Sequence, residues 1–188
     1  VQELARTAKS KRSRHLRYAS VGRGSVSHLC GALFERATGA TLEHHAYEGA
    51  QPAVQALIHG EVDLYFGTPP TFLPHVRAGA VRALATTALH RAEAFPDLPR
   101  MADAYPGFEV VGWHAVFAAE VQRLSQKVGE VMALQDVKRR LARQGFRVTT
   151  STPQELTSRI EGEVALWRER LAESGVDLDG GAASKADR

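Results

Sequence analysis

A short stretch near the start of the chain, SVGRGSVSHL at positions 20–29, places two glycines and three serines between a predicted strand and a predicted helix. A phosphate-binding P-loop requires a lysine followed by serine or threonine after its glycines, and a nucleophile elbow requires G-x-S-x-G; the stretch contains neither. The alternative for such a stretch by itself is an ordinary turn and helix cap. Its glycines also allow the backbone to approach a small carboxylate, and the hydroxyls of Ser25 and Ser27 add donors. From these residues alone the ordinary turn and cap is the more common outcome, and a loop that binds a small carboxylate stays open beside it.

The other side chains that could do chemistry do not combine into a metal or catalytic site. His44 and His45 are adjacent in a predicted strand, so they point to opposite faces of a sheet and are poorly placed to chelate one metal ion. Ser27 and His28 lie roughly 100° apart on the first turn of a predicted helix, which separates a nucleophile from its base. Cys30 is the single cysteine, so no internal disulfide or thiol metal cluster is expected. The sequence predicts no metal and no cofactor.

An enzyme is the second class of function that these residues leave open. A small α/β hydrolase or transferase would use Asp63 or His114 as its base. Asp63 stands in a predicted strand beside apolar residues, with no nucleophile at a motif spacing. We therefore favour a binding module, in which affinity comes from backbone N–H donors and no bond is broken.

The composition is typical of a soluble α/β protein, with 44% apolar, 24% charged and 7% aromatic residues among 188. This length is sufficient for one ordinary domain or two small lobes. A net charge of +3 suits an anionic ligand without predicting a nucleic-acid partner. A basic run without interleaved aromatic residues is expected to be a solvated face: Lys9, Lys11, Arg12, Arg14 and Arg17. We expect no membrane-spanning segment and no signal peptide in this sequence.

Hydrophobic periodicity and breaker residues predict alternating helices and strands. Helices are predicted over residues 1–11, 26–38, 51–60, 71–78, 121–132, 135–144 and 152–173. Strands are predicted over residues 15–20, 41–47, 62–66, 81–87, 108–118 and 146–150. Such units form parallel sheets, whose ligands bind beyond the carboxyl ends of the strands. Three loops are expected there, each before a helix whose free N–H groups favour an anion: 21–25, 47–51 and 67–71.

Two stretches, YASVGRGSVSHLCGALFERATGA (18–40) and the segment 44–118 that begins HHAYEGAQPAVQALIHGEVDLYFGTPP, resemble the substrate-binding proteins of tripartite tricarboxylate transporters, the Bug family. The likeness is collinear over residues 1–177. It implies an α/β fold of the type II periplasmic-binding-protein-like kind. It also implies a periplasmic receptor that captures a small organic carboxylate and passes it to membrane transporter subunits, without an enzymatic step.

The resemblance implies parts of two lobes. Residues 14–117 match a complete ligand-binding second lobe, with a mainly parallel sheet flanked by helices. Residues 1–13 and 118–177 match a mainly helical remnant of the first lobe, and 178–188 is expected to be a flexible tail. Because family members begin with further strands and helices, the chain is expected to lack the N-terminal part of the first lobe.

The resemblance also carries ligand-site residues over. The residues that match the second-lobe ligand loop of the family are Gly22, Arg23, Gly24, Ser25 and Ser27. Gly67 and Thr68 match the loop after the VDLYF strand, and Tyr47 and Gly49 match a motif whose role is mostly structural. Gly67 stands where relatives often carry an acid, so a ligand ammonium would lack a partner there.

The predicted C-terminal helices carry apolar stripes whose first-lobe partner is expected to be missing: Val128, Val131, Leu141, Ile160 and Leu171. We expect these stripes to pack on the second lobe or on a second copy of the chain, in a dimer or larger assembly. A site that is closed from one side only leaves its ligand in contact with water. We therefore expect dissociation constants nearer millimolar than micromolar.

Overall fold

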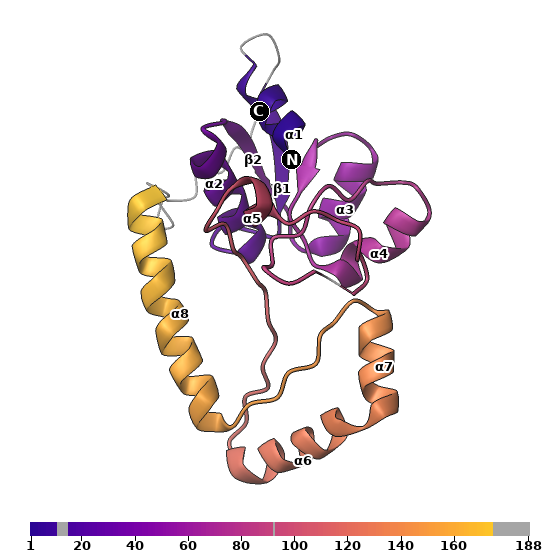
Figure 1. The fold of residues 1–188 in the computed structure, drawn as a ribbon, viewed down its shortest axis with the longest axis vertical. Coiled ribbons are helices and arrows are strands. Elements are labelled where there is room, and N and C mark those ends of the chain that lie inside the picture. The colour runs from indigo at the N-terminus through magenta and orange to yellow at the C-terminus, as the bar shows by residue number, and fades with distance from the viewer. Residues whose placement is uncertain (11–14, 92, 175–188) are drawn as a thin grey trace.

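The computed structural model describes residues 1–10, 15–91 and 93–174, arranged as Figure 1 shows. The N-terminal body consists of α1 (Gln2–Lys9), β1 (Leu16–Ser20), α2 (Val26–Thr38), β2 (Leu42–Ala46), α3 (Ala50–Ile58), β3 (Leu64–Tyr65), α4 (Pro69–Arg77) and α5 (Met101–Ala104). An outer arm follows, with α6 (Val121–Ala133), α7 (Gln135–Arg143) and α8 (Pro153–Ser174). The seven predicted helices are confirmed, and α5 is additional. The predicted tail, 178–188, lies outside the described residues.

The three strands form one parallel sheet in the order β2-β1-β3. β1 pairs with β2 from Leu16 opposite Leu42 to Ser20 opposite Ala46, and it pairs with β3 at Tyr18 opposite Leu64. Parallel strands need crossover connections, and α2 connects β1 to β2 while α3 connects β2 to β3 across β1. The predicted parallel arrangement of the first three strands is therefore confirmed.

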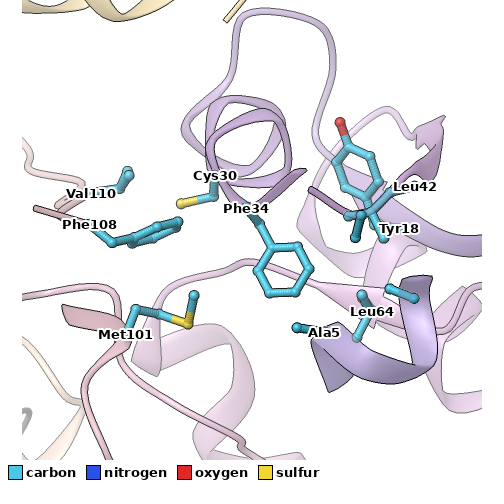
Figure 2. Packing of buried hydrophobic residues seen from close by; sticks show 11 residues of the cluster. Ala5, Tyr18, Cys30, Phe34, Leu42, Leu64, Met101, Phe108 and Val110 are labelled. Carbon is cyan, nitrogen blue, oxygen red and sulfur yellow. The ribbon is translucent and has the colours of Figure 1, made fainter. Parts of the chain in front are cut away.

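Helices cover both faces of the sheet because successive side chains of β1 alternate between the faces. Tyr18 belongs to the main core cluster, which also contains residues of α1, α2, β2, β3 and α5. Figure 2 shows Phe34 of α2 at the centre of this cluster. The next residue, Ala19, lies in a second cluster on the opposite face with Ala53 and Ala56 of α3.

Three expected strands are absent from the described structure: 81–87, 108–118 and 146–150. In the first of them, only Thr86 makes a bridge, to Arg100. Thr87 and Val110 exchange a backbone and a side-chain hydrogen bond, which does not extend into a ladder. A β-rich segment forms a strand only where a neighbouring strand receives its hydrogen bonds, and the sheet ends at β3.

The outer arm leaves the sheet-containing body and returns along it (Figure 1). α8 begins with the predicted capping box, in which the Glu155 N–H donates to Thr152 Oγ1 over 3.2 Å and the Thr152 N–H donates to the Glu155 carboxylate over 2.7 Å. Trp167 packs against the main core cluster, and Arg170 donates to the carbonyl of Glu109 over 2.7 Å. These contacts anchor α8 on the body. Among the described helices, none is long and apolar enough to cross a lipid bilayer.

Candidate functional site

Three loops follow the carboxyl ends of the strands, at one end of the sheet. β1, β2 and β3 are parallel and end at Ser20, Ala46 and Tyr65, so the loops that follow them lie beyond the same end of the sheet. β1 is the central strand, which places the loop after it between the other two. The topology thus groups the three loops that the sequence singles out, while their role in ligand binding stays a prediction.

The serine–glycine loop, residues 21–27, is preformed by its own hydrogen bonds. Ser25 is the N-cap of α2, and its hydroxyl oxygen accepts from the His28 N–H over 3.3 Å. The same hydroxyl donates to the carbonyl of Gly22 over 2.6 Å, and the Ser25 N–H donates to that carbonyl over 3.3 Å. The Ser25 hydroxyl proton therefore closes the loop.

Some backbone N–H groups of the serine–glycine loop do not take part in these internal hydrogen bonds. Ser27 Oγ accepts from the Val21 N–H over 3.1 Å and lies 3.0 Å from Ser25 Oγ, so both hydroxyls are already engaged inside the loop. Within the described residues, no acceptor is found for the backbone N–H groups of Arg23, Val26 and Ser27. The last two lie in the first turn of α2, where the helix dipole is positive. Backbone amides are thus the donors available to an anion.

Two glycines set the backbone path of the loop. Gly22 has φ 117° and Gly24 has φ 73°, a region that L side chains rarely adopt. A Cβ at either position would meet nothing within 4 Å. The conformation, and not the available space, therefore demands glycine at these positions. Arg23 stands exposed between them.

A pair of histidines lies against the loop. The rings of His28 and His44 stack with centroids 4.3 Å apart at 23°, and Tyr18 stacks on His44 at 4.9 Å. The Gly24 N–H donates to His28 Nδ1 over 3.0 Å. His44 Nε2 lies 2.6 Å from Ser20 Oγ, which accepts from the Gly22 N–H over 3.1 Å.

Burial keeps both imidazoles uncharged at neutral pH. It lowers the pKa of His28, and the nearby Arg23 lowers it further. Burial also lowers the pKa of His44 to about 4, with additional repulsion from His28, Arg23 and His45. A neutral His28 is consistent with its Nδ1 lone pair accepting an N–H. His28 itself is only 7% exposed.

The loop after β3 contains Gly67 and Thr68. A Cβ on Gly67 would collide with the ring of Phe72, whose Cδ2 and Cζ would lie 3.3 Å away. Pro69 and the following Pro70 have no N–H, and the Thr71 N–H donates to the Thr68 carbonyl over 3.1 Å. The start of α4 therefore provides fewer amide donors than sequence reasoning expects, and the Thr68 hydroxyl, 3.1 Å from that of Thr71, is the polar side chain that remains.

The loop after β2 contains Tyr47 and Gly49. The Tyr47 N–H donates to the Ser20 carbonyl over 2.9 Å, which continues the β1–β2 pairing into the loops. The Tyr47 side chain packs against the second core cluster. Gly49, with φ 123°, is the N-cap of α3. Both residues shape the edge of the sheet in this structure.

The candidates for an enzymatic base are placed elsewhere. Both carboxylate oxygens of Asp63 accept hydrogen bonds from Arg17, over 2.9–3.2 Å, near the amino end of the sheet. His114 is exposed, and its ring meets that of Phe146 edge-on at 5.8 Å. Among the residues that the structure describes, no cluster of three His, Cys, Asp or Glu side chains could hold a metal ion.

The sequence did not predict the contacts of His44 with Ser20 and His28, or a role of His28 in holding the loop. His44 is expected to pack or face solvent on a strand, and His28 to cap or pack on a helix. The contact between them depends on strand register, which sets His44 opposite Tyr18, and on the rotation of α2 over the sheet. The number of residues between His28 and His44 in the sequence determines neither the register of β2 nor the rotation of α2.

The chain is similar in sequence to a known family of receptor proteins. The family model described as "Tripartite tricarboxylate transporter family receptor" matches residues 1–176. The Bordetella pertussis protein BugT is 33% identical over 162 residues, which cover 82% of this chain and 50% of BugT. The chain spans about half the length of the first curated relatives that it matches.

Solved structures share the architecture. The R. palustris protein Rpa4515, solved with adipate, superposes with a TM-score of 0.83 at 29% identity over 93% of this chain and 60% of that one. The periplasmic binding protein BugD gives a TM-score of 0.81 at 30% identity, over 94% of this chain and 62% of its own. MatC from Rhodopseudomonas palustris, with bound malate, gives 0.75 at 26% identity, over 91% and 61%. The expected periplasmic-binding-protein-like fold is confirmed, and the hydrolase or transferase alternative is not favoured.

Proposed function

Because the chain belongs to the tripartite tricarboxylate transporter receptor family, we propose that it captures a small organic carboxylate in the periplasm for the membrane subunits of such a transporter. Two solved neighbours hold adipate and malate, which supports a dicarboxylate of four to six carbons as the ligand class. Binding breaks no bond, so the energetic task is to replace the hydration shell of a carboxylate with fixed donors.

The observation that supports this proposal most strongly is the preformed serine–glycine loop. The N–H groups of Arg23, Val26 and Ser27 are available at the positive end of α2, and the guanidinium of Arg23 adds a full charge beside them. One ligand carboxylate accepts from these donors. Since the β3–α4 loop borders the same sheet edge, the Thr68 hydroxyl serves the second carboxylate or a ligand hydroxyl.

We propose that residues 14–117 supply one side of the ligand site and that the outer arm belongs to a separate lobe. A carboxylate on the serine–glycine loop then keeps one side in water, where its hydrogen bonds compete with hydration. The expected dissociation constant is on the order of 1 mM.

We also propose that the outer arm mediates assembly with a second copy of the chain. Four apolar side chains of the arm and its connection are strongly exposed: Val116 (68%), Phe117 (74%), Val131 (49%) and Leu134 (52%). Apolar surface of this kind favours association. Sedimentation velocity should give a dimer or larger species that a Phe117→Asp change weakens. A monodisperse monomer at about 0.1 mM protein would contradict this proposal.

The binding proposal is tested by thermal unfolding in increasing adipate or malate. Stabilisation follows RT ln(1 + [L]/Kd), so a millimolar site gives little shift at about 0.1 mM ligand and about 1.4 kcal/mol at roughly 10 mM. Ser25→Asp keeps a good N-cap for α2, removes the hydroxyl proton that the Gly22 carbonyl accepts, and places a negative charge in the loop, which costs bound carboxylate on the order of 1–4 kcal/mol.

Ser158→Asp adds the same charge at an exposed position of α8 and is the matched control. Ligand stabilisation should disappear in Ser25→Asp and persist in Ser158→Asp. Equal stabilisation of both variants would remove the serine–glycine loop from the binding site. No stabilisation of the wild-type chain at about 50 mM ligand would contradict the proposed function.

A further inference from the structure

The stacked histidines lie where they can control the serine–glycine loop. Each imidazole is linked by hydrogen bonds to one of the two glycines of the loop: His28 accepts directly from the Gly24 N–H, and His44 is linked to the Gly22 N–H through the Ser20 hydroxyl. These glycines are the positions at which the loop backbone enters the positive-φ region. A hydrogen bond at each of them selects one path from the many that glycine permits.

The His28 contact requires a lone pair on one defined nitrogen. Because Nδ1 accepts the Gly24 N–H over 3.0 Å, the ring proton of the neutral imidazole must be on Nε2. A protonated imidazole would present an N–H to the Gly24 N–H, and the bond would be lost. The lowered pKa of His28, caused mainly by burial, keeps this lone pair available at neutral pH.

The His44 contact acts on the other glycine. Ser20 is fully buried, and its hydroxyl lies 2.6 Å from His44 Nε2 while it accepts from the Gly22 N–H over 3.1 Å. The Ser20 hydroxyl also donates to the Gly22 carbonyl over 3.2 Å, so His44 is the third partner that orients this hydroxyl and, through it, the entry of the chain into the loop. Stacking of His44 between Tyr18 and His28 holds both imidazoles in one column.

We propose that His28 and His44 are positioning residues for carboxylate binding, which hold the serine–glycine loop in its donor geometry through Gly24 and Gly22. This inference rests on the proposed function for the ligand, whereas the effect on the loop can be measured without any ligand. The N–H groups of Arg23, Val26 and Ser27 keep their present directions only if the two glycines keep their conformations.

Paired substitutions separate the hydrogen bonds from the stacking. His28→Asn places an oxygen on Cγ where Nδ1 was, whereas His28→Phe keeps a ring and removes the acceptor. His44→Gln reaches the Nε2 position with an amide, and His44→Phe keeps only the stack. His45→Phe is the control, because the adjacent His45 bonds Glu43, and the described residues show no hydrogen bond or ring stacking between His45 and the loop.

The first measurement is amide hydrogen exchange without ligand. We expect Gly24 exchange to be at least 10-fold faster in His28→Phe, Gly22 exchange to be at least 10-fold faster in His44→Phe, and most of the protection to return in His28→Asn and His44→Gln. His45→Phe should match the wild-type chain at both glycines. Unchanged exchange in both Phe variants, or equal loss in Phe and rescue variants that remain folded, would overturn the inference.

The second measurement is the adipate dissociation constant of the same variants by calorimetry. We expect at least a 10-fold increase in His28→Phe and His44→Phe, with recovery in the Asn and Gln variants. Wild-type affinity in both Phe variants would overturn the positioning role. If the wild-type chain does not bind adipate although exchange behaves as expected, the proposed ligand fails and the action of the histidines on the loop stands.

Discussion

Gly31, in the middle of α2, should resist replacement by alanine even though alanine is the better helix former. A Cβ at this position would lie 2.5 Å from Cζ and 2.9 Å from Cδ2 of Tyr18, closer than real Cβ contacts allow. Tyr18 is 2% exposed and stacks on His44, so its ring has no open space into which it can move.

The expected effect is the difference between two opposing contributions. Replacing a helical glycine by alanine stabilises a helix by roughly 1 kcal/mol. Overpacking a filled core costs about 1–3 kcal/mol, and this contact falls at the upper end because a rigid ring opposes it. We therefore expect Gly31→Ala to lower the free energy of unfolding by about 1–2 kcal/mol.

Urea unfolding followed by circular dichroism measures this difference. Gly162→Ala in α8 is the matched control, since a Cβ there would meet nothing within 4 Å. That variant should gain about 0.5–1 kcal/mol from helix propensity alone. If Gly31→Ala is as stable as Gly162→Ala, the packing of α2 on Tyr18 described above is wrong.

Three further outcomes are expected. The pKa of His44 is about 4 in the folded chain, below the ordinary 6.5, so the unfolded chain binds the proton first. Neutral His44 therefore contributes on the order of 1–2 kcal/mol to the free energy of unfolding above pH 6.5, after solvent screening, and this contribution is lost as the pH falls toward 4. A pH series of urea midpoints in which His44→Phe retains the wild-type slope would contradict this. Burial raises the pKa of the Cys30 thiol to about 12, so a thiol reagent at pH 8 should label the chain only as fast as it unfolds, and rapid labelling of folded protein would count against a buried Cys30. Thr152→Ala removes the N-cap bond to Glu155 and should cost about 1 kcal/mol with fraying of α8; unchanged helix content and stability would show that the cap is dispensable.

The sequence predicts best where a local interaction determines the structure. α2 starts after Ser25, whose hydroxyl caps the helix, and ends before Gly39, which takes the left-handed conformation with φ 66°. Both features depend on a few neighbouring residues and can be predicted from them. The parallel direction of β1, β2 and β3 also follows from the alternation of strands with crossover helices, whereas their order β2-β1-β3 does not.

The errors concern interactions between distant segments. Residues 81–87 and 108–118 have the composition of strands, yet only Thr87 and Val110 hydrogen-bond between them, because β propensity does not specify a pairing partner. The stacking of His28 on His44 likewise depends on register and helix rotation, so it could not be predicted from the sequence. At the start of α4, Pro69 and Pro70 were visible in the sequence, and their missing N–H groups could have been counted there.

The most direct test of carboxylate binding is a titration of the ¹⁵N-labelled chain with adipate, followed amide by amide. The proposed mechanism predicts saturable shifts on a millimolar scale, largest at the amides of Arg23, Val26 and Ser27 and smaller at Thr68. Ser158→Asp should reproduce these shifts, and Ser25→Asp should abolish them. Saturable shifts centred on other residues, or their absence at about 50 mM adipate, would contradict the serine–glycine loop as a carboxylate site.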